Sequence, residues 1–165
     1  KIINVSVPVG SDENRCRELL KSAGIKAANI VNPHVPLAYA LIEEELDATF
    51  LVIDLEPSQS NYVIKAFSVE PVFYTSDSET HSVISSLNRL YIDWYDKHKE
   101  KISHVVFSGK KVLDQNFIDY ISKETKFEII RGDVFTNLRL KEGSVPILNK
   151  NDSYKYAIAI GLTIM

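Results

Sequence analysis

Two acidic residues at the end of an apolar run are the best candidates for chemistry in this sequence. Residues 49–54 read TFLVID, and Glu56 follows Asp54 after one intervening leucine. A short apolar run of this kind predicts a strand buried on both faces. An acid at its carboxyl end either caps the next turn or holds a metal-bound water, and side chains two positions apart share a face of the strand. Asp54 and Glu56 could therefore bind a divalent cation together, whereas a carboxylate-dependent nuclease would need further acids that the pattern does not place.

A basic turn after a second apolar strand is the other candidate. Residues 104–107 are expected to form this strand, and Ser108, Gly109, Lys110 and Lys111 follow it. A lysine pair in such a loop can attract phosphate, although a solvated turn is the simpler interpretation. The chain has no glycine-rich Walker-type loop and no nucleophile elbow. The spacing typical of metal ligands is missing from the cysteine and the histidines, so no metal site is predicted at Cys16, His34, His81, His98 or His104.

Alternating strands and helices are expected to position these residues. Strands are predicted at residues 2–9, 25–31, 49–54, 61–67, 72–74, 104–107 and 127–130. Helices are predicted from 12 to 23, from 36 through 41 with an exposed end at 43–45, and at 79–101, 114–124 and 154–165. Ser11-Asp12 suits the cap of the first helix and Gly24 suits the position just after its end, with one apolar stripe formed by Cys16, Leu19, Leu20 and Ala23. Three consecutive strands joined by short turns predict a β-meander. The pattern predicts an α/β fold, with a smaller N-terminal α/β lobe at residues 1–47 and a larger lobe at 48–165.

The composition is that of a packed domain. Of the 165 residues, 45% are apolar and 25% are charged, so the chain can bury a core. The formal net charge of −3 argues against a nucleic-acid partner, which requires a basic face. A single cysteine excludes a disulfide within the chain, which fits a reducing compartment. No apolar stretch of the sequence has the length of a membrane span.

Four segments, in the expected order along the chain, resemble the actin-like ATPase superfamily. Residues 18–26 and 32–41 resemble the part of PilM-like proteins that returns into their first large subdomain. Residues 51–64 lie where such proteins have their second phosphate loop, 102–109 resemble the adenosine motif, and 156–162 resemble the closing helix. These relatives are the PilM-like proteins of type IV pilus machines and the cytoplasmic part of the type II secretion L protein. The resemblance implies a reduced actin-like (ribonuclease H-like) fold that lacks part of the nucleotide-binding subdomains.

The departures from the family pattern fall on residues that would hold a nucleotide. Glu56 stands where the family has a glycine, so it adds a side chain and a negative charge near the expected phosphate. Lys110 and Lys111 occupy the positions of further glycines after Gly109. The family's first phosphate hairpin has no counterpart, and residues 74–79 leave no room for the usual extra subdomain. The resemblance therefore implies no cofactor and no catalysis, with degenerate positions at Asp54, Glu56, Gly109, Lys110 and Lys111.

Short versions of this kind resemble the cytoplasmic part of the bundle-forming pilus C protein, a single-span inner-membrane component. By that resemblance the chain is expected to be a non-catalytic scaffold at the cytoplasmic face of a bacterial inner membrane, with a membrane tether after Met165. Its expected partners are the hexameric assembly ATPase and the polytopic platform protein, and a homodimer is left open. The acidic run Glu43-Glu44-Glu45 is the expected docking surface, with the exposed side of the helix at 79–101 as the alternative. The alternative function is a nucleotide-binding actin-like ATPase that uses Asp54 with a metal.

Overall fold

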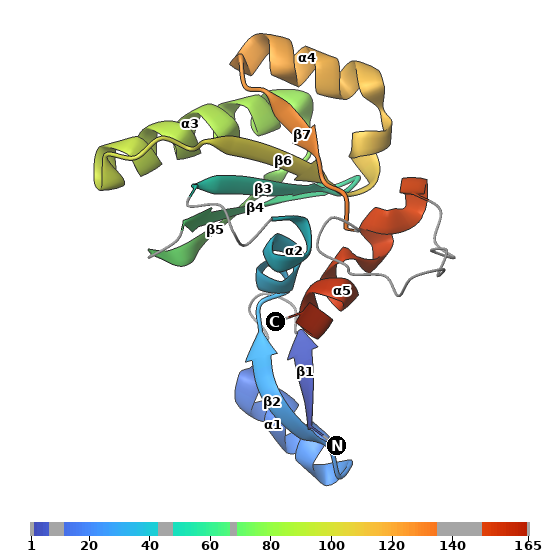
Figure 1. Ribbon diagram of the computed structural model, residues 1–165. Coiled ribbons are helices and arrows are strands. Elements are labelled where there is room, and N and C mark those ends of the chain that lie inside the picture. Colours follow the sequence, from blue (N-terminus) through green and yellow to red (C-terminus); the bar gives the residue numbers. More distant parts are fainter. Residues whose placement is uncertain (1, 7–11, 43–47, 67–68, 135–149, 165) are drawn as a thin grey trace, which may run out of the picture.

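A five-stranded mixed sheet lies at the centre of the molecule (Figure 1). The computed structural model describes residues 2–6, 12–42, 48–66, 69–134 and 150–164. The sheet has the order β5-β4-β3-β6-β7, formed by β3 (Phe50–Leu55), β4 (Gln59–Ala66), β5 (Val69–Asp77), β6 (His104–Ser108) and β7 (Ile129–Arg131). β3, β4 and β5 are antiparallel neighbours, whereas β6 runs parallel to β3, and β7 parallel to β6. The predicted α/β class and the predicted β-meander are therefore confirmed.

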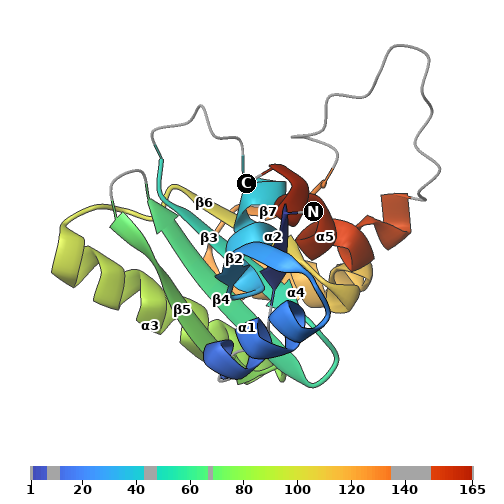
Figure 2. The ribbon, with the colours of Figure 1, turned by 90° about the horizontal axis from the view of Figure 1, so that it is seen from below.

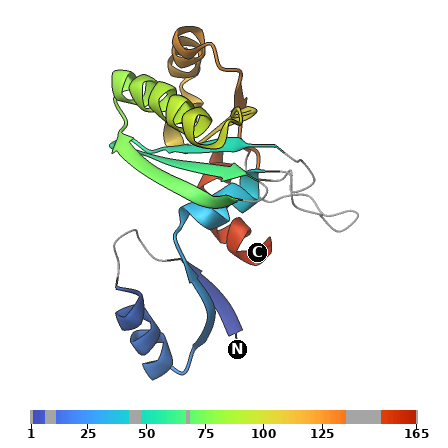
Figure 3. The ribbon, with the colours of Figure 1, turned by 90° about the vertical axis from the view of Figure 1, so that its left-hand side faces the viewer.

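Two helices cover each face of this sheet. α3 (Thr80–His98) and α4 (Gln115–Thr125) lie on one face, and α2 (His34–Leu41) and α5 (Ala157–Ile164) lie on the other (Figures 1 and 3). Alternate residues of β3 face the two helix layers. Leu51 and Ile53 pack in the core under α3 and α4, whereas Val52 packs in the core beside α2 and α5. The predicted burial of β3 on both faces is confirmed, because these three side chains are fully buried.

The first three elements form a separate two-stranded unit. β1 (Ile2–Ser6) pairs in parallel with β2 (Lys26–Val31), and α1 (Glu13–Ser22) connects them. The carboxylate of Asp12 caps α1 by accepting the amides of Asn14 and Arg15 at 2.9 and 3.1 Å. Gly24 has φ of +71° after the end of the helix, as its position in the sequence predicts. Figure 3 shows that this unit projects away from the five-stranded sheet.

The predicted apolar stripe of α1 is not covered by other described residues. α1 contains no buried residue, and the side chain of Leu19 is 63% exposed. Ala23 is exposed as well, while Cys16 and Leu20 are only half-buried. The physical reason is the small size of this unit, because two strands offer one helix too little apolar surface to cover a full stripe.

Helices α2 and α5 join the small unit to the sheet. Gly161 of α5 lies directly against α2, where an added Cβ would stand 1.8 Å from the carbonyl oxygen of Pro36. The amide of Asn4 in β1 also donates to the carbonyl of Leu162 at 3.1 Å. α2 lies within the predicted N-terminal lobe, yet its buried residues pack against the sheet. The lobe boundary at residue 47 stays a prediction.

The largest differences in extent from the predictions are in β5 and in the last helix. β5 spans nine residues rather than three, because it pairs with β4 over nearly its whole length and alternates between more and less exposed positions. Such an edge strand lacks the apolar run that marks a buried one. The last predicted helix begins as a 3₁₀ segment, η2 (Lys150–Tyr156), before α5. There Lys155 forms an ion pair with Asp152, three positions earlier, and this spacing brings side chains together in a 3₁₀ helix.

Candidate functional site

Four polar residues form a row across the sheet where β3 and β6 end. Strand pairing places Thr75 opposite Asn61, Asn61 opposite Asp54, and Asp54 opposite Ser108. Asn61 is held by two donors, the side-chain amide of Gln59 at 2.6 Å and the hydroxyl of Thr75 at 3.3 Å. Alternation along β3 puts Asp54 on the same face as Val52, which is the face covered by α2 and α5. This row, called here the polar row, contains the predicted Asp54.

Asp54 is an unusually weak acid for its type. Burial and, to a smaller extent, the negative charge of Glu56 together raise the pKa of its carboxyl to about 6. Ser108, directly opposite, is 3% exposed, and its hydroxyl has no hydrogen-bond partner within the described residues. The row thus offers one carboxyl group, one amide and two hydroxyls. Near neutral pH its charge is negative, which disfavours a phosphate unless a cation lies between them.

Gly109 closes the end of the row. It has φ of +91°, and an added Cβ would lie 2.6 and 2.7 Å from the backbone oxygen and nitrogen of Leu55 and 2.8 Å from a carboxylate oxygen of Asp54. No other residue type fits at such distances without moving the backbone. The loop after β6 therefore lies directly against the end of β3, and the glycine predicted at this position has a packing role.

The turn between β3 and β4 is closed by its own hydrogen bonds. The backbone amide of Glu56 donates to the carbonyl of Gln59 at 3.0 Å, so this amide is engaged within the turn. The buried hydroxyl of Ser78 donates to the carbonyl of Pro57 at 2.7 Å. Lys111 in turn donates its ammonium to the carbonyl of Ser78. The turn, the start of α3 and the loop after β6 are thereby tied together around Ser78.

The structure brings some of the predicted site residues together and places others apart. Asp54, Glu56 and Gly109 are brought together at the ends of β3 and β6. Lys110 is exposed, and Lys111 lies over the ring of Phe117 with its ammonium 5.3 Å from the ring centre. The two lysine side chains therefore lie in different surroundings, and the lysine pair stays a prediction as a phosphate-binding group. The predicted docking residues lie outside the described part of the chain: Glu43, Glu44 and Glu45.

The sequence prediction missed three polar residues that lie at the same end of the sheet as Asp54. Asn61, Thr75 and Ser78 belong to the same end of the sheet, but strand register decides which residues stand opposite one another, and a sequence does not state it. The side-chain bond between Ser78 and Pro57 joins residues 21 positions apart. Asn61 could have been found by its place in the quoted segment 51–64, since a two-residue turn sets it opposite Asp54.

The fit of these residues to a nucleotide phosphate is poor. An actin-like fold would hold phosphate with free backbone amides after β3, but the amide of Glu56 is used inside the turn. The described residues include no group of three or more histidine, cysteine, aspartate or glutamate side chains that could hold a metal ion.

Within the same residues, no helix combines the length and apolarity needed to cross a bilayer.

The architecture is shared with solved structures of actin-like fold. It consists of a β-meander followed by alternating helices and strands, with two helices on each face of the sheet. Among solved structures the chain is similar to a PilM–PilN type IV pilus biogenesis complex, with a TM-score of 0.61 and 14% identity over 92% of this chain. It is also similar to the ethanolamine utilization protein EutJ from Carboxydothermus hydrogenoformans, with a TM-score of 0.59 and 10% identity over 99% of this chain.

These similarities confirm the actin-like, PilM-like architecture that the sequence resemblance implied. The chain spans 56% of the solved pilus protein and 66% of EutJ, so it corresponds to a part of each. By sequence, no family model and no curated protein significantly matches the chain.

Proposed function

We propose that this chain is a non-catalytic docking domain of a type IV pilus biogenesis machine, related in design to type II secretion systems. In this role it lies at the cytoplasmic face of a bacterial inner membrane and binds other components of the machine. The fold shared with the PilM–PilN complex supports this proposal, because that complex is itself a pilus assembly of interacting proteins. Fold alone does not carry function, so the proposal depends on the site.

The observation that carries the proposal is the closure of the strand ends. Gly109 packs against Leu55, the amide of Glu56 is bonded within its own turn, and Lys111 is bonded to Ser78. A phosphate-binding loop needs free amides and an approachable backbone at this place. Groups that bond to one another at the strand ends are not free to bind a nucleotide. Such a fold can still present its surfaces to partner proteins.

We propose the hexameric assembly ATPase and the polytopic platform protein as partners. A second copy of this chain is a further proposed partner. Glu43, Glu44 and Glu45 form an acidic run in the sequence, and we propose that it meets a basic patch on the ATPase. Replacing all three with lysine should weaken capture of the purified ATPase at low salt. Unchanged capture by this triple variant would remove the acidic run from the docking surface.

The experiment for the function is co-purification with the neighbouring components of the same machine. The tagged chain should retain the assembly ATPase or the platform protein equally well in the presence and absence of Mg-ATP. Retention of neither component, using membranes that contain the complete machine, would contradict the docking role.

A nucleotide-binding role is the second candidate. The specific observation in its favour is the polar row, which places Asp54 at the end of a buried strand beside Asn61 and Ser108. Carboxylate, amide and hydroxyl oxygens are suitable ligands for a hard cation such as Mg²⁺. Saturable binding of Mg-ATP that is lost on Asp54→Asn would favour this second role over the first.

A further inference from the structure

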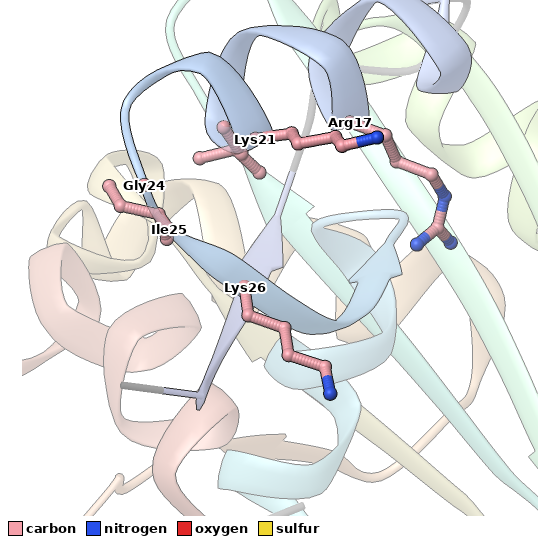
Figure 4. Close-up of a pocket in the computed structure, with 6 residues that line it drawn as sticks. Arg17, Lys21, Gly24, Ile25 and Lys26 are labelled. Atoms are coloured by element: carbon pink, nitrogen blue, oxygen red, sulfur yellow. The ribbon is translucent and has the colours of Figure 1, made fainter.

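The small unit carries a pocket of about 400 Å³ where α1 turns into β2 (Figure 4). Three of its six lining residues are basic and two are apolar, and they come from the end of α1, the turn and the start of β2: Arg17, Leu20, Lys21, Gly24, Ile25 and Lys26. The turn itself is fixed by backbone bonds from Gly24 to Lys21 at 3.0 Å and from Ile25 to Leu20 at 2.8 Å. The pocket is thus built on an ordered helix end.

The basic side chains of this pocket have no acidic partner within the described residues. None of the ion pairs found there involves Arg17, Lys21 or Lys26, and all three are exposed. Arg17 and Lys21 are four positions apart on α1, where like charges repel each other. Figure 4 shows the side chains of Arg17 and Lys21 beside each other on α1, and that of Lys26 extending from the start of β2. This concentration of positive charge is complementary to an acidic ligand.

Apolar surface lies beside these charges. Ile25 in the pocket is 38% exposed, and Leu19 on the same helix is 63% exposed. β2 also has an open edge, because β1 is its only neighbour among the described strands. An open strand edge offers backbone groups that can pair with an added strand. The surface therefore combines charge, an apolar contact and a template for an extended chain.

We propose that this pocket and the outer edge of β2 bind an extended acidic segment of a partner protein. Carboxylates of the segment meet Arg17, Lys21 and Lys26, an apolar side chain packs against Leu20 and Ile25, and its backbone pairs with β2. The proposal rests on the docking function proposed above and names the chemistry of one partner. An anionic membrane fits less well, because a lipid surface has no backbone groups that could pair with the open edge of β2.

The test uses the complete 165-residue chain and a labelled decapeptide of alternating glutamate and leucine, with a glutamine–leucine decapeptide as the matched probe. Fluorescence anisotropy at low salt should show saturable binding of the acidic peptide, and binding should weaken as salt rises. The variant R17E/K21E/K26E should weaken this binding at least tenfold. The control variant K97E/K101E/K123E reverses three exposed lysines elsewhere and should bind as the original chain does.

A second readout addresses the mode of binding. Backbone amide exchange in β2 should slow when the acidic peptide is bound, since an added strand protects amides that face the open edge. Equal weakening by the two triple variants, or equal binding of the acidic and glutamine peptides, would overturn the proposal. Capture of the chain by phosphatidylserine vesicles, dependent on Arg17, Lys21 and Lys26 and without peptide binding, would also overturn it in favour of a lipid surface.

The two proposals fail separately. If the chain retains the assembly ATPase and R17E/K21E/K26E retains it equally, the docking function stands and this surface is wrong. If the acidic peptide binds at the pocket and no component of the pilus machine is retained, the surface stands and the proposed function is wrong.

Discussion

Two glycine turns, one in each part of the molecule, show how differently these parts are built. Gly109 and Gly24 both have positive φ, at +91° and +71°. A Cβ at Gly109 would collide with the backbone of Leu55, whereas a Cβ at Gly24 would meet nothing within 4 Å (Figure 2 shows the small unit and the sheet from below). At the sheet end, where an actin-like fold would hold a nucleotide, the turn is packed against the protein's own backbone. In the small unit, the turn at Gly24 has open space around it.

The same contrast appears in the helices. α3 buries residues such as Leu87 completely in the core of the sheet, whereas α1 buries none. The part of the molecule with the candidate chemistry is thus the stable scaffold, and the part without it carries the unpaired charges of Arg17, Lys21 and Lys26. This division fits the docking role proposed above.

The largest effect is expected at the closed end. Gly109→Ala should destabilise the fold by about 3 kcal/mol, because the methyl group overlaps Leu55 and the backbone angle is unfavourable for any other residue. Urea unfolding measures this change as a lower midpoint at constant slope. A loss below about 1 kcal/mol would mean that the two loops are not in direct contact, and the closure of the strand ends would then be wrong.

The next effect is the pH dependence of Asp54. Its pKa rises from 3.8 to about 6 on folding, so the folded state binds this proton more tightly than the unfolded state. The contribution of this group to stability is therefore complete below about pH 4 and is lost as the pH rises through about 6, by about 3 kcal/mol at most. Unfolding free energies should show this loss between about pH 4 and 7.

Two variants sharpen the assignment of this pH effect. Asp54→Asn should remove that part of the pH dependence and leave a protein that is more stable than the original at pH 7.5. Glu56→Gln should lower the pKa of Asp54, because Glu56 contributes to raising it. Equal pH profiles for the original chain and Asp54→Asn would contradict the burial of this carboxyl group.

The smallest effect is expected at the open end. Gly24→Ala should cost about 1 kcal/mol, since the backbone angle is unfavourable for alanine but no atom stands in its way. The same urea titration gives this value beside that for Gly109→Ala. The comparison between the two parts depends on the difference between these two losses of unfolding free energy. An equal loss for Gly24→Ala and Gly109→Ala would mean that the turn of the small unit is packed as tightly as the turn at the sheet end.

The fold was predictable where burial dominates the residue pattern. β3 reads as an unbroken apolar run because both faces of the sheet are covered, and the meander follows from the short turns beside it. The stripe on α1 was misleading because apolar spacing predicts a covered face, and only the tertiary structure decides whether a cover exists. Asp54 was found by its place at a strand end, whereas its neighbours Asn61 and Ser108 depend on register.

The most direct test of the central claim is a titration of the chain with Mg-ATP and Mg-ADP, followed by calorimetry and by the melting temperature. A bound nucleotide at a hundredfold excess over its dissociation constant would stabilise the fold by about 2.7 kcal/mol, which is readily seen as a higher melting temperature. The closed strand ends around Gly109, Glu56 and Lys111 predict no binding heat and an unchanged melting temperature at millimolar nucleotide. A saturable heat signal together with a raised melting temperature, both lost in Asp54→Asn, would contradict the account and make this chain a nucleotide-binding protein.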